Sequence, residues 1–185
     1  MVSMKEKPVR LTAPGTIVLE RILPGPIERV WAYLTESDKR AKWVAAGNMD
    51  LREGGSYEYI FDNEILSEEQ EEVPEKYKDT CGSEITMNGH IIAVKPPTLL
   101  HMTWAEGEDE ESEVKFELEA IGDKVKLTLT HSKLFDRDML IGVSAGWQAH
   151  VGIMCDNLAG VPARPFWKTH MELEELYAKT LFNET

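Results

Sequence analysis

The chain has 185 residues, of which 42% are hydrophobic, and its formal net charge is −13 at pH 7. This length and apolar content are typical of one globular domain with a single core. The negative charge argues against a nucleic-acid or anionic-membrane partner, because phosphate binding needs clustered Lys and Arg, and no apolar run approaches the ~20 residues of a membrane span.

Residues 1–15 are expected to form an N-terminal tail. They contain no apolar segment of the kind found in secretory signals. Cys81 and Cys155 lie far apart in the chain, and without an export signal such cysteines are more often reduced thiols than a disulfide. The cytoplasm is therefore the expected location.

The first predicted elements are a strand over residues 16–23 and two short helices. The apolar residues of the strand share one face, with Arg21 among them. Pro26 opens the first helix, because proline is tolerated in a first helical turn. Ser37 is a good N-cap residue, and it predicts a second helix that runs to about residue 43.

Two strands are predicted next, over residues 49–51 and 56–61, with a bend at Gly54-Gly55. A glycine pair permits the positive φ angles of a tight hairpin turn. In the second strand Tyr57, Tyr59 and Phe61 alternate with other residues, so an aromatic face is expected.

Residues 62–80 break this pattern. The segment holds eight acidic residues and two lysines and has no sustained periodicity. It is interpreted as a long solvated insertion with one helical turn around residues 67–72. Loops of this length are uncommon in compact domains unless they are mobile or functional, so a lid over a pocket is the alternative.

The second half of the chain predicts the rest of the sheet and a long helix. Strands are expected over residues 83–94, with a kink at Gly89, and over 99–105. Apolar and polar residues then alternate over 113–120 and 124–131, which predicts an antiparallel hairpin with one apolar face. A helix over 136–159 would cover that face.

No βαβ alternation occurs, so an α+β domain is expected over residues 16–160. Gly160-Val161-Pro162 ends the long helix, and the C-terminal segment 161–185 predicts a further amphipathic helix over residues 166–181. This helix is expected to pack on the outside of the domain. A homodimer contact is the alternative.

No motif predicts catalytic residues, a metal site or a cofactor. None of the five histidines has a metal-ligand spacing to another His, Cys, Asp or Glu. Residues 142–146, Gly-Val-Ser-Ala-Gly, resemble a nucleophile elbow only loosely and fall inside the predicted long helix. Their small side chains are expected to let that helix approach the sheet closely.

A long helix laid across a curved antiparallel sheet can enclose a cavity. The helix is rich in glycine and the facing strands carry large residues, which favours a cavity over tight packing; a plain core is the alternative. Inward polar residues would orient a mostly apolar ligand, and Arg21, His131 and His150 are the candidates. The full set of candidate cavity residues is Arg21, Trp43, Tyr57, Tyr59, Trp104, Phe116, Leu129, His131, Val143, Trp147, His150 and Met154.

Several motifs carry a resemblance to a known family. They are Arg21-Ile22, Pro26 with Val30-Trp31, Trp43, Gly54-Gly55-x-Tyr57, Pro96-Pro97-x-Leu99, Trp104, Leu-Thr-Leu-Thr-His-Ser at 127–132, and Gly146-Trp147. Their order and spacing resemble bacterial proteins related to the C-terminal domain of the activator of the heat-shock protein 90 ATPase (AHSA-type), in the START and Bet v 1-like helix-grip superfamily (SRPBCC). The resemblance implies a curved antiparallel sheet wrapped around a long C-terminal helix, with a hydrophobic cavity between them.

Members of this superfamily bind lipids, sterols, flavonoids or polyketides, and some are cyclases or aromatases. The resemblance therefore implies binding of a small hydrophobic, lipid-like molecule without catalysis. One alternative is an enzyme of the polyketide cyclase or hydrolase type, in which Arg21, His131 or His150 moves protons; it predicts two or more titratable side chains converging in the cavity. Another is a chaperone-associated interaction module with an acidic surface, although no room is expected for the N-terminal chaperone-binding domain of the eukaryotic activator.

Overall fold

The computed structural model describes residues 6–81 and 83–183, without the side chain of Cys81. Seven strands form one curved antiparallel sheet in the order β1-β2-β7-β6-β5-β4-β3. Their bounds are β1 Arg10–Ala13, β2 Thr16–Pro24, β3 Ser56–Phe61, β4 Ile85–Lys95, β5 Leu99–Trp104, β6 Ser112–Ile121 and β7 Lys124–Ser132.

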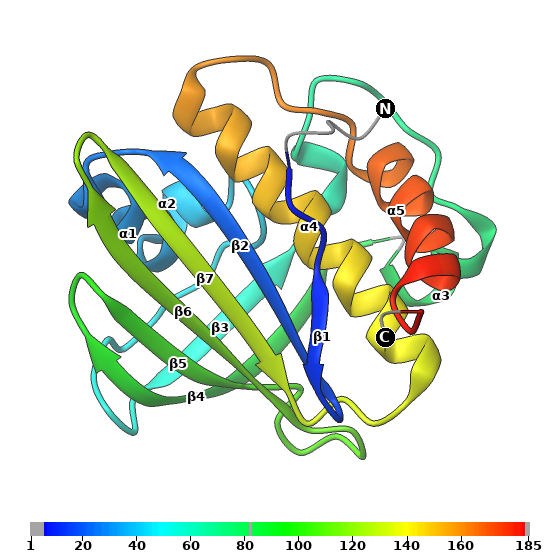
Figure 1. The fold of residues 1–185 in the computed structure, drawn as a ribbon, viewed down its shortest axis with the longest axis horizontal. Coiled ribbons are helices and arrows are strands. Elements are labelled where there is room, and N and C mark those ends of the chain that lie inside the picture. Colours follow the sequence, from blue (N-terminus) through cyan, green and yellow to red (C-terminus); the bar gives the residue numbers. More distant parts are fainter. Residues whose placement is uncertain (1–5, 82, 184–185) are drawn as a thin grey trace.

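The helices cover one face of this sheet and one of its ends. Helix α4 (Arg137–Ala159) crosses the inner face, and α5 (Phe166–Thr180) packs against α4 (Figure 1). Helices α1 (Ile27–Thr35) and α2 (Ser37–Arg40) lie at the end of the sheet, where α1 contacts β6 and β7. The chain therefore has the predicted α+β class. No helix among the described residues is long and apolar enough to cross a membrane.

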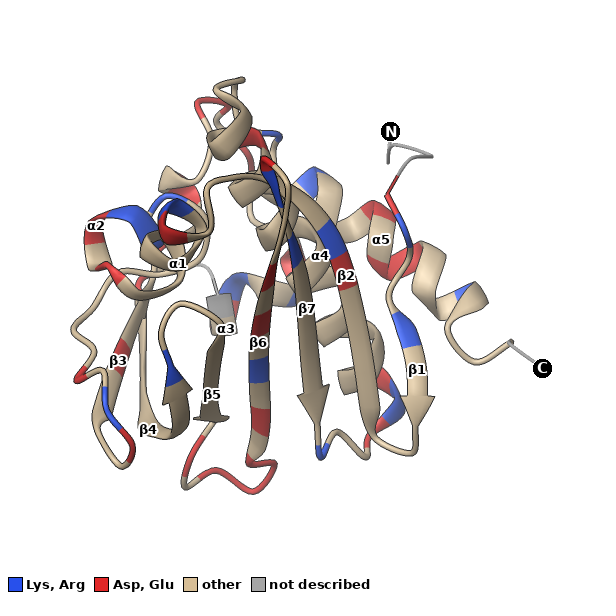
Figure 2. Cartoon of the chain, turned by 60° about the vertical axis from the view of Figure 1, so that its left-hand side comes forward, with Lys and Arg blue, Asp and Glu red and all other residues tan. Residues whose placement is uncertain are grey.

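The β6–β7 hairpin confirms the predicted alternation. Along both strands every second residue is buried, from Val114 to Leu118 and from Val125 to His131, because those side chains face the core. The charged residues between them lie on the outer face, which Figure 2 shows as alternating acidic and basic bands on β6. The turn has Gly122 at a positive φ of 60°, a conformation that glycine adopts without steric cost.

Helix α4 begins and ends with well-formed caps. The side chain of Asp136 accepts a hydrogen bond from the backbone N–H of Met139 at 2.9 Å, and Gly160 ends the helix in the left-handed conformation. Buried residues occur on all sides of the helix, because it lies between the sheet and α5.

Gly142 and Gly146 of α4 lie beside the acidic insertion and α5, which corrects the expectation that they let the helix approach the sheet. A Cβ on Gly146 would lie 3.8 Å from the ring of His170 on α5. A Cβ on Gly142 would lie 4.0 Å from the hydroxyl oxygen of Tyr77 in the acidic insertion. These two glycines therefore make room for α5 and the insertion.

Four further local expectations are corrected. Residues 49–51 form no strand, because Met49 makes only an isolated bridge to Tyr57. Helix α2 ends at Arg40 rather than residue 43. The irregularity in β4 lies between Ile91 and Ala93 rather than at Gly89. The expected tail contains β1, which pairs with β2.

The acidic insertion is ordered by contacts with α5. It has no helical turn at 67–72; its helical turns are instead Asn63–Ile65, Glu75–Tyr77 and Lys78–Cys81. The carboxylate of Glu71 accepts hydrogen bonds from the first free amides of α5, those of Trp167 at 2.9 Å and Lys168 at 2.8 Å. Tyr77 stacks on Trp167, with ring centroids 5.3 Å apart, and donates to Glu174 at 2.6 Å. The insertion therefore packs against α5 and is hydrogen-bonded to it, whereas the sequence predicted a freely solvated loop.

Of the two cysteines, Cys155 carries a free thiol. The side chain of Cys81 lies outside the described residues, and so does any pairing that it makes.

Candidate functional site

A small cavity lies between α4 and the ends of β3 and β5. Its volume is about 130 Å³. The lining side chains come from the segment after α2, from β3, from β5 and from α4; they are Val44, Phe61, Trp104, Val143, Gly146, Trp147 and His150. Six of these seven residues are apolar, so the cavity is suited to an apolar guest.

Aromatic rings from the sheet and from α4 surround the cavity. Trp104 and Trp147 are in contact with each other in the cavity wall, with ring centroids 5.0 Å apart. Tyr59 and Phe116 support them from behind, at 5.7 Å from Trp104 and 5.6 Å from Trp147 respectively. These edge-to-face contacts are favourable for aromatic pairs, and they leave a cavity of about the size of one ring.

His131 positions Trp147 and is itself fully occupied. The indole N–H of Trp147 donates to His131 Nδ1 at 2.9 Å, so this nitrogen carries a lone pair and the ring proton sits on Nε2. Nε2 then donates to the hydroxyl of Ser112 at 2.7 Å. Burial lowers the pKa of His131 to about 3, because the charged form would lose its hydration. His131 is therefore a neutral support of the cavity wall.

His150 is the one titratable residue among the described residues that line the cavity. Its Nδ1 lies 2.8 Å from the backbone carbonyl of Trp43, and the ring of Phe166 lies against it with centroids 4.5 Å apart. Burial lowers its pKa to about 4, although the hydrogen bond to Trp43 opposes the shift. The imidazole is therefore neutral at physiological pH.

The loop after α2 is held by a buried arginine. Arg40 donates from Nε to the carbonyl of Ala45 at 3.0 Å and from Nη1 to that of Thr35 at 3.2 Å. Its Nη2 donates to the carbonyl of Gly47, and its guanidinium lies over the ring of Tyr59, 4.7 Å from the centroid. This loop supplies Val44 to the cavity and the Trp43 carbonyl to His150.

The structure brings only some of the predicted site residues together. Trp104, Val143, Trp147 and His150 line the cavity. Tyr59, Phe116, His131 and Trp43 support it, as described above. Leu129 and Met154 are buried in the core and are not part of the lining. Tyr57 packs over Gly89, and its hydroxyl donates to the carbonyl of Thr103 at 2.5 Å.

Arg21 lies away from the cavity, which corrects its expected place in it. The side chain is buried on the inner face of β2, where Nη1 donates to the carbonyls of Lys7 and Glu20. Its nearest carboxylate is that of Glu6, which also pairs with Arg164. Arg21 therefore belongs to a polar cluster between the N-terminal segment and the α4–α5 connection.

Sequence reasoning missed three lining residues: Val44, Phe61 and Gly146. Phe61 completes the alternation of Tyr57 and Tyr59, so this pattern could have identified it. Val44 lies in an irregular loop, and no periodic signal marks it.

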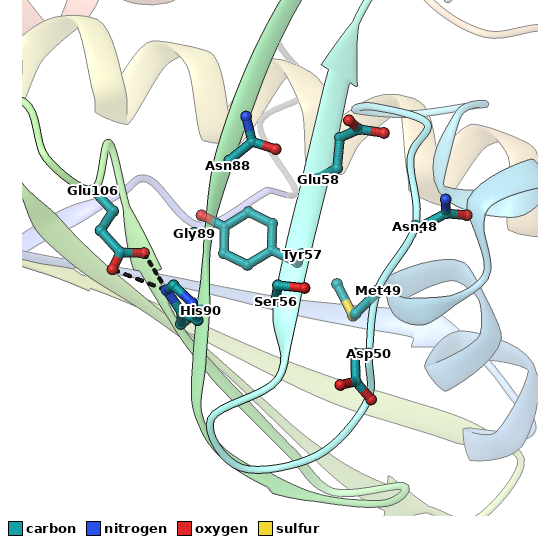
Figure 3. A pocket seen from close by; sticks show the side chains of 10 residues that line it. All are labelled: Asn48, Met49, Asp50, Ser56, Tyr57, Glu58, Asn88, Gly89, His90 and Glu106. Atoms are coloured by element: carbon teal, nitrogen blue, oxygen red, sulfur yellow. Dashed lines mark hydrogen bonds and ion pairs between the residues drawn. The ribbon is translucent and has the colours of Figure 1, made fainter.

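A second, open hollow lies on the outer side of β3 and β4. Its volume is about 670 Å³, and Figure 3 shows the ten residues that line it, most of them polar. The ring nitrogen Nδ1 of His90 lies 2.8 Å from the carboxylate of Glu106, and the Thr103 hydroxyl donates to the same carboxylate. These polar groups satisfy one another. No group of three or more His, Cys, Asp or Glu within the described ranges could hold a metal ion.

The chain is similar in sequence and structure to known proteins. Residues 24–159 match the family described as Activator of Hsp90 ATPase homolog 1-like protein. A search of functionally curated proteins gives no match. A solved structure from Bordetella parapertussis is 38% identical, with a TM-score of 0.80, and the comparison covers 97% of this chain and 93% of that one.

Two further solved structures share the fold at lower identity. CalU16 from Micromonospora echinospora is 23% identical with a TM-score of 0.65, over 95% of this chain and 96% of its own. DynU16, a protein in the dynemicin biosynthetic locus, is 20% identical with a TM-score of 0.61, over 84% of this chain and 51% of its own.

Proposed function

Because the chain belongs to the family of Activator of Hsp90 ATPase homolog 1-like proteins, which have the START and Bet v 1-like helix-grip fold, we propose that it binds one small apolar molecule in the cavity between α4 and the sheet. The observation that carries this proposal is the aromatic and aliphatic lining of that cavity. A binding protein needs such a lining, because burial of apolar ligand surface supplies most of the affinity.

The volume of the cavity limits the ligand. Drug-sized ligands occupy pockets of roughly 300–1,000 Å³, whereas this cavity holds about 130 Å³. An apolar cavity of ~150 Å³ in another protein accepts benzene or xenon. The side-chain arrangement described here therefore favours a guest of about one ring over a lipid, sterol or polyketide.

The residues at this cavity favour a binding function over a catalytic one. A cyclase or hydrolase would need at least two titratable groups at the cavity. His150 is the one such residue in the described lining, and both ring nitrogens of His131 are engaged by Ser112 and Trp147.

The acidic insertion is proposed to control access to the cavity. It follows Phe61, which lines the cavity, and Tyr77 near its other end approaches Gly142, the neighbour of the lining residue Val143. It is attached to α5 by the two hydrogen bonds of Glu71, by the stacking of Tyr77 on Trp167 and by the hydrogen bond from Tyr77 to Glu174, so opening requires these contacts to break together. A guest would then pass between the insertion and β3.

Replacing Val143 by phenylalanine tests the proposal, because the added ring atoms would occupy the cavity. We expect toluene at ten times its Kd to stabilise the wild-type protein by about 1.4 kcal/mol, which raises the Tm by roughly 3–6 °C for a chain of this size. We expect no rise for Val143→Phe. The matched control is Val161→Phe, an exposed site outside the cavity, which should respond like the wild type. An equal rise in Val143→Phe, or none in the wild type, contradicts the proposal.

A further inference from the structure

Two side-chain polar atoms of the residues that line the cavity have no hydrogen-bond partner among the described residues: the indole nitrogen of Trp104, which is a donor, and Nε2 of His150. His150 is 9% exposed, and its Nδ1 is engaged by the Trp43 carbonyl, but none of the described residues hydrogen-bonds its Nε2. We propose that the ligand is a single-ring aromatic compound with one O–H or N–H group, which donates a hydrogen bond to Nε2 of His150. This inference rests on the proposed function and adds the chemical class of the ligand.

The tautomer of His150 follows from its partner. A backbone carbonyl can only accept a hydrogen bond, so Nδ1 must carry the proton that bridges the 2.8 Å to Trp43. In a neutral imidazole the other nitrogen then has a lone pair and can only accept. A polar ligand group that approaches Nε2 must therefore donate a hydrogen bond to it.

The surroundings of His150 keep the ring neutral. Phe166 covers it from α5, and the nearby His170, also on α5, disfavours a second positive charge. The hydrogen bond to the Trp43 carbonyl favours the charged form, but burial outweighs it, so the pKa of His150 falls to about 4. At neutral pH the cavity thus presents a hydrogen-bond acceptor and no charge.

The rest of the lining selects an aromatic ring. Trp104, Trp147 and Phe61 present ring faces and edges, with which an aromatic guest can form offset or edge-to-face contacts. A volume of about 130 Å³ admits about one six-membered ring with a small substituent. A single donor at one end of such a ring satisfies the one free acceptor.

Phenol and toluene are matched probes for this inference, since each has seven non-hydrogen atoms and only phenol has a donor. A cavity without an acceptor would prefer toluene, because the phenol hydroxyl would leave water unpaired. We expect the wild-type protein to bind phenol at least as tightly as toluene in calorimetric titrations. Tighter binding of toluene would overturn the inference and leave the proposed function intact, whereas binding of neither probe would overturn both.

Two substitutions separate the two nitrogens of His150. In His150→Asn the amide N–H can still reach the Trp43 carbonyl, but no acceptor remains at the position of Nε2. In His150→Gln the longer side chain can place an amide oxygen there. We expect the ratio of phenol to toluene affinity to fall about tenfold in His150→Asn, the equivalent of ~1.4 kcal/mol, and to fall less in His150→Gln. An unchanged ratio in folded His150→Asn would overturn the inference.

A spectroscopic readout in the wild-type protein does not depend on how the variants fold. The ¹⁵N resonance of an unprotonated imidazole nitrogen moves when that nitrogen accepts a hydrogen bond. We expect the Nε2 resonance of His150 to move on addition of phenol and to move much less with toluene. An equal response to the two probes would overturn the assignment of Nε2 as the recognition atom.

Discussion

Replacement of Arg40 by methionine is expected to lower the free energy of unfolding by about 3–5 kcal/mol, because three backbone carbonyls each lose a hydrogen bond worth roughly 1–3 kcal/mol. The guanidinium is fully buried, and no described carboxylate lies within ion-pair distance of it. Its charge is instead stabilised by backbone carbonyls and by the face of Tyr59. Methionine has a similar length, so the main loss is hydrogen bonding: buried carbonyls would remain unpaired.

The same substitution should also weaken toluene binding. Arg40 holds the loop that carries Trp43 and Val44, and these residues fix His150 and line the cavity. Urea denaturation monitored by tryptophan fluorescence measures the loss of stability. Lys42→Met is the matched control, because Lys42 is exposed in the same loop and should cost less than about 0.5 kcal/mol. Similar losses for the two variants would contradict this role of Arg40.

The stability of the protein is expected to fall by about 3 kcal/mol between pH 6.5 and pH 5. Burial lowers the pKa of His131 to about 3 and that of His150 to about 4, from an ordinary value of 6.5. In this pH range the unfolded chain therefore binds protons that the folded protein excludes. The full contribution is present above pH 6.5 and is lost as the pH falls toward the folded-state pKa values.

Carboxylates with lowered pKa values, including those of Glu20, Glu113 and Glu174, act in the same direction. The ordinary pKa of a glutamate side chain is 4.5, so these groups act mainly below that pH, and the range from pH 6.5 to 5 reports chiefly on histidines. Burial also lowers the pKa of His170, which adds to the effect. Urea unfolding at the two pH values measures it, and His150→Gln should show a smaller difference than the wild type. Stability that is independent of pH over this range would contradict the neutral, buried state of both histidines.

The sheet and the long helix were predictable because their residues repeat with a clear period. The alternation on either side of Gly122 defines β6 and β7, and Asp136 and Gly160 mark the ends of α4. Residues 49–51 have too short a pattern to define a strand, and an isolated bridge forms there instead. The contacts of the insertion with α5 join residues about 96 positions apart, which no local pattern encodes.

The presence of an apolar cavity between helix and sheet could be predicted from the sequence, but only some of its lining residues could be identified. Alternation shows which face of a strand is buried, but it does not show which positions along that face lie near one another. Arg21 and Trp104 thus both come from inner strand faces, yet Arg21 joins Glu6 and Trp104 joins the cavity. Similarly, the spacing of Gly142 and Gly146 does not reveal that α5 and the insertion, rather than the sheet, occupy the space beside them.

An apolar guest is proposed to enter the cavity beside Trp104 and Trp147. The most direct test follows the indole N–H signals of the wild-type protein by ¹H–¹⁵N NMR during a toluene titration. We expect saturable shifts of the Trp104 and Trp147 signals, because ring currents of the guest act on the cavity wall, and little change for Trp31 on α1, which does not line the cavity. Unshifted Trp104 and Trp147 signals at saturating toluene, or shifts confined to Trp31, would contradict the account.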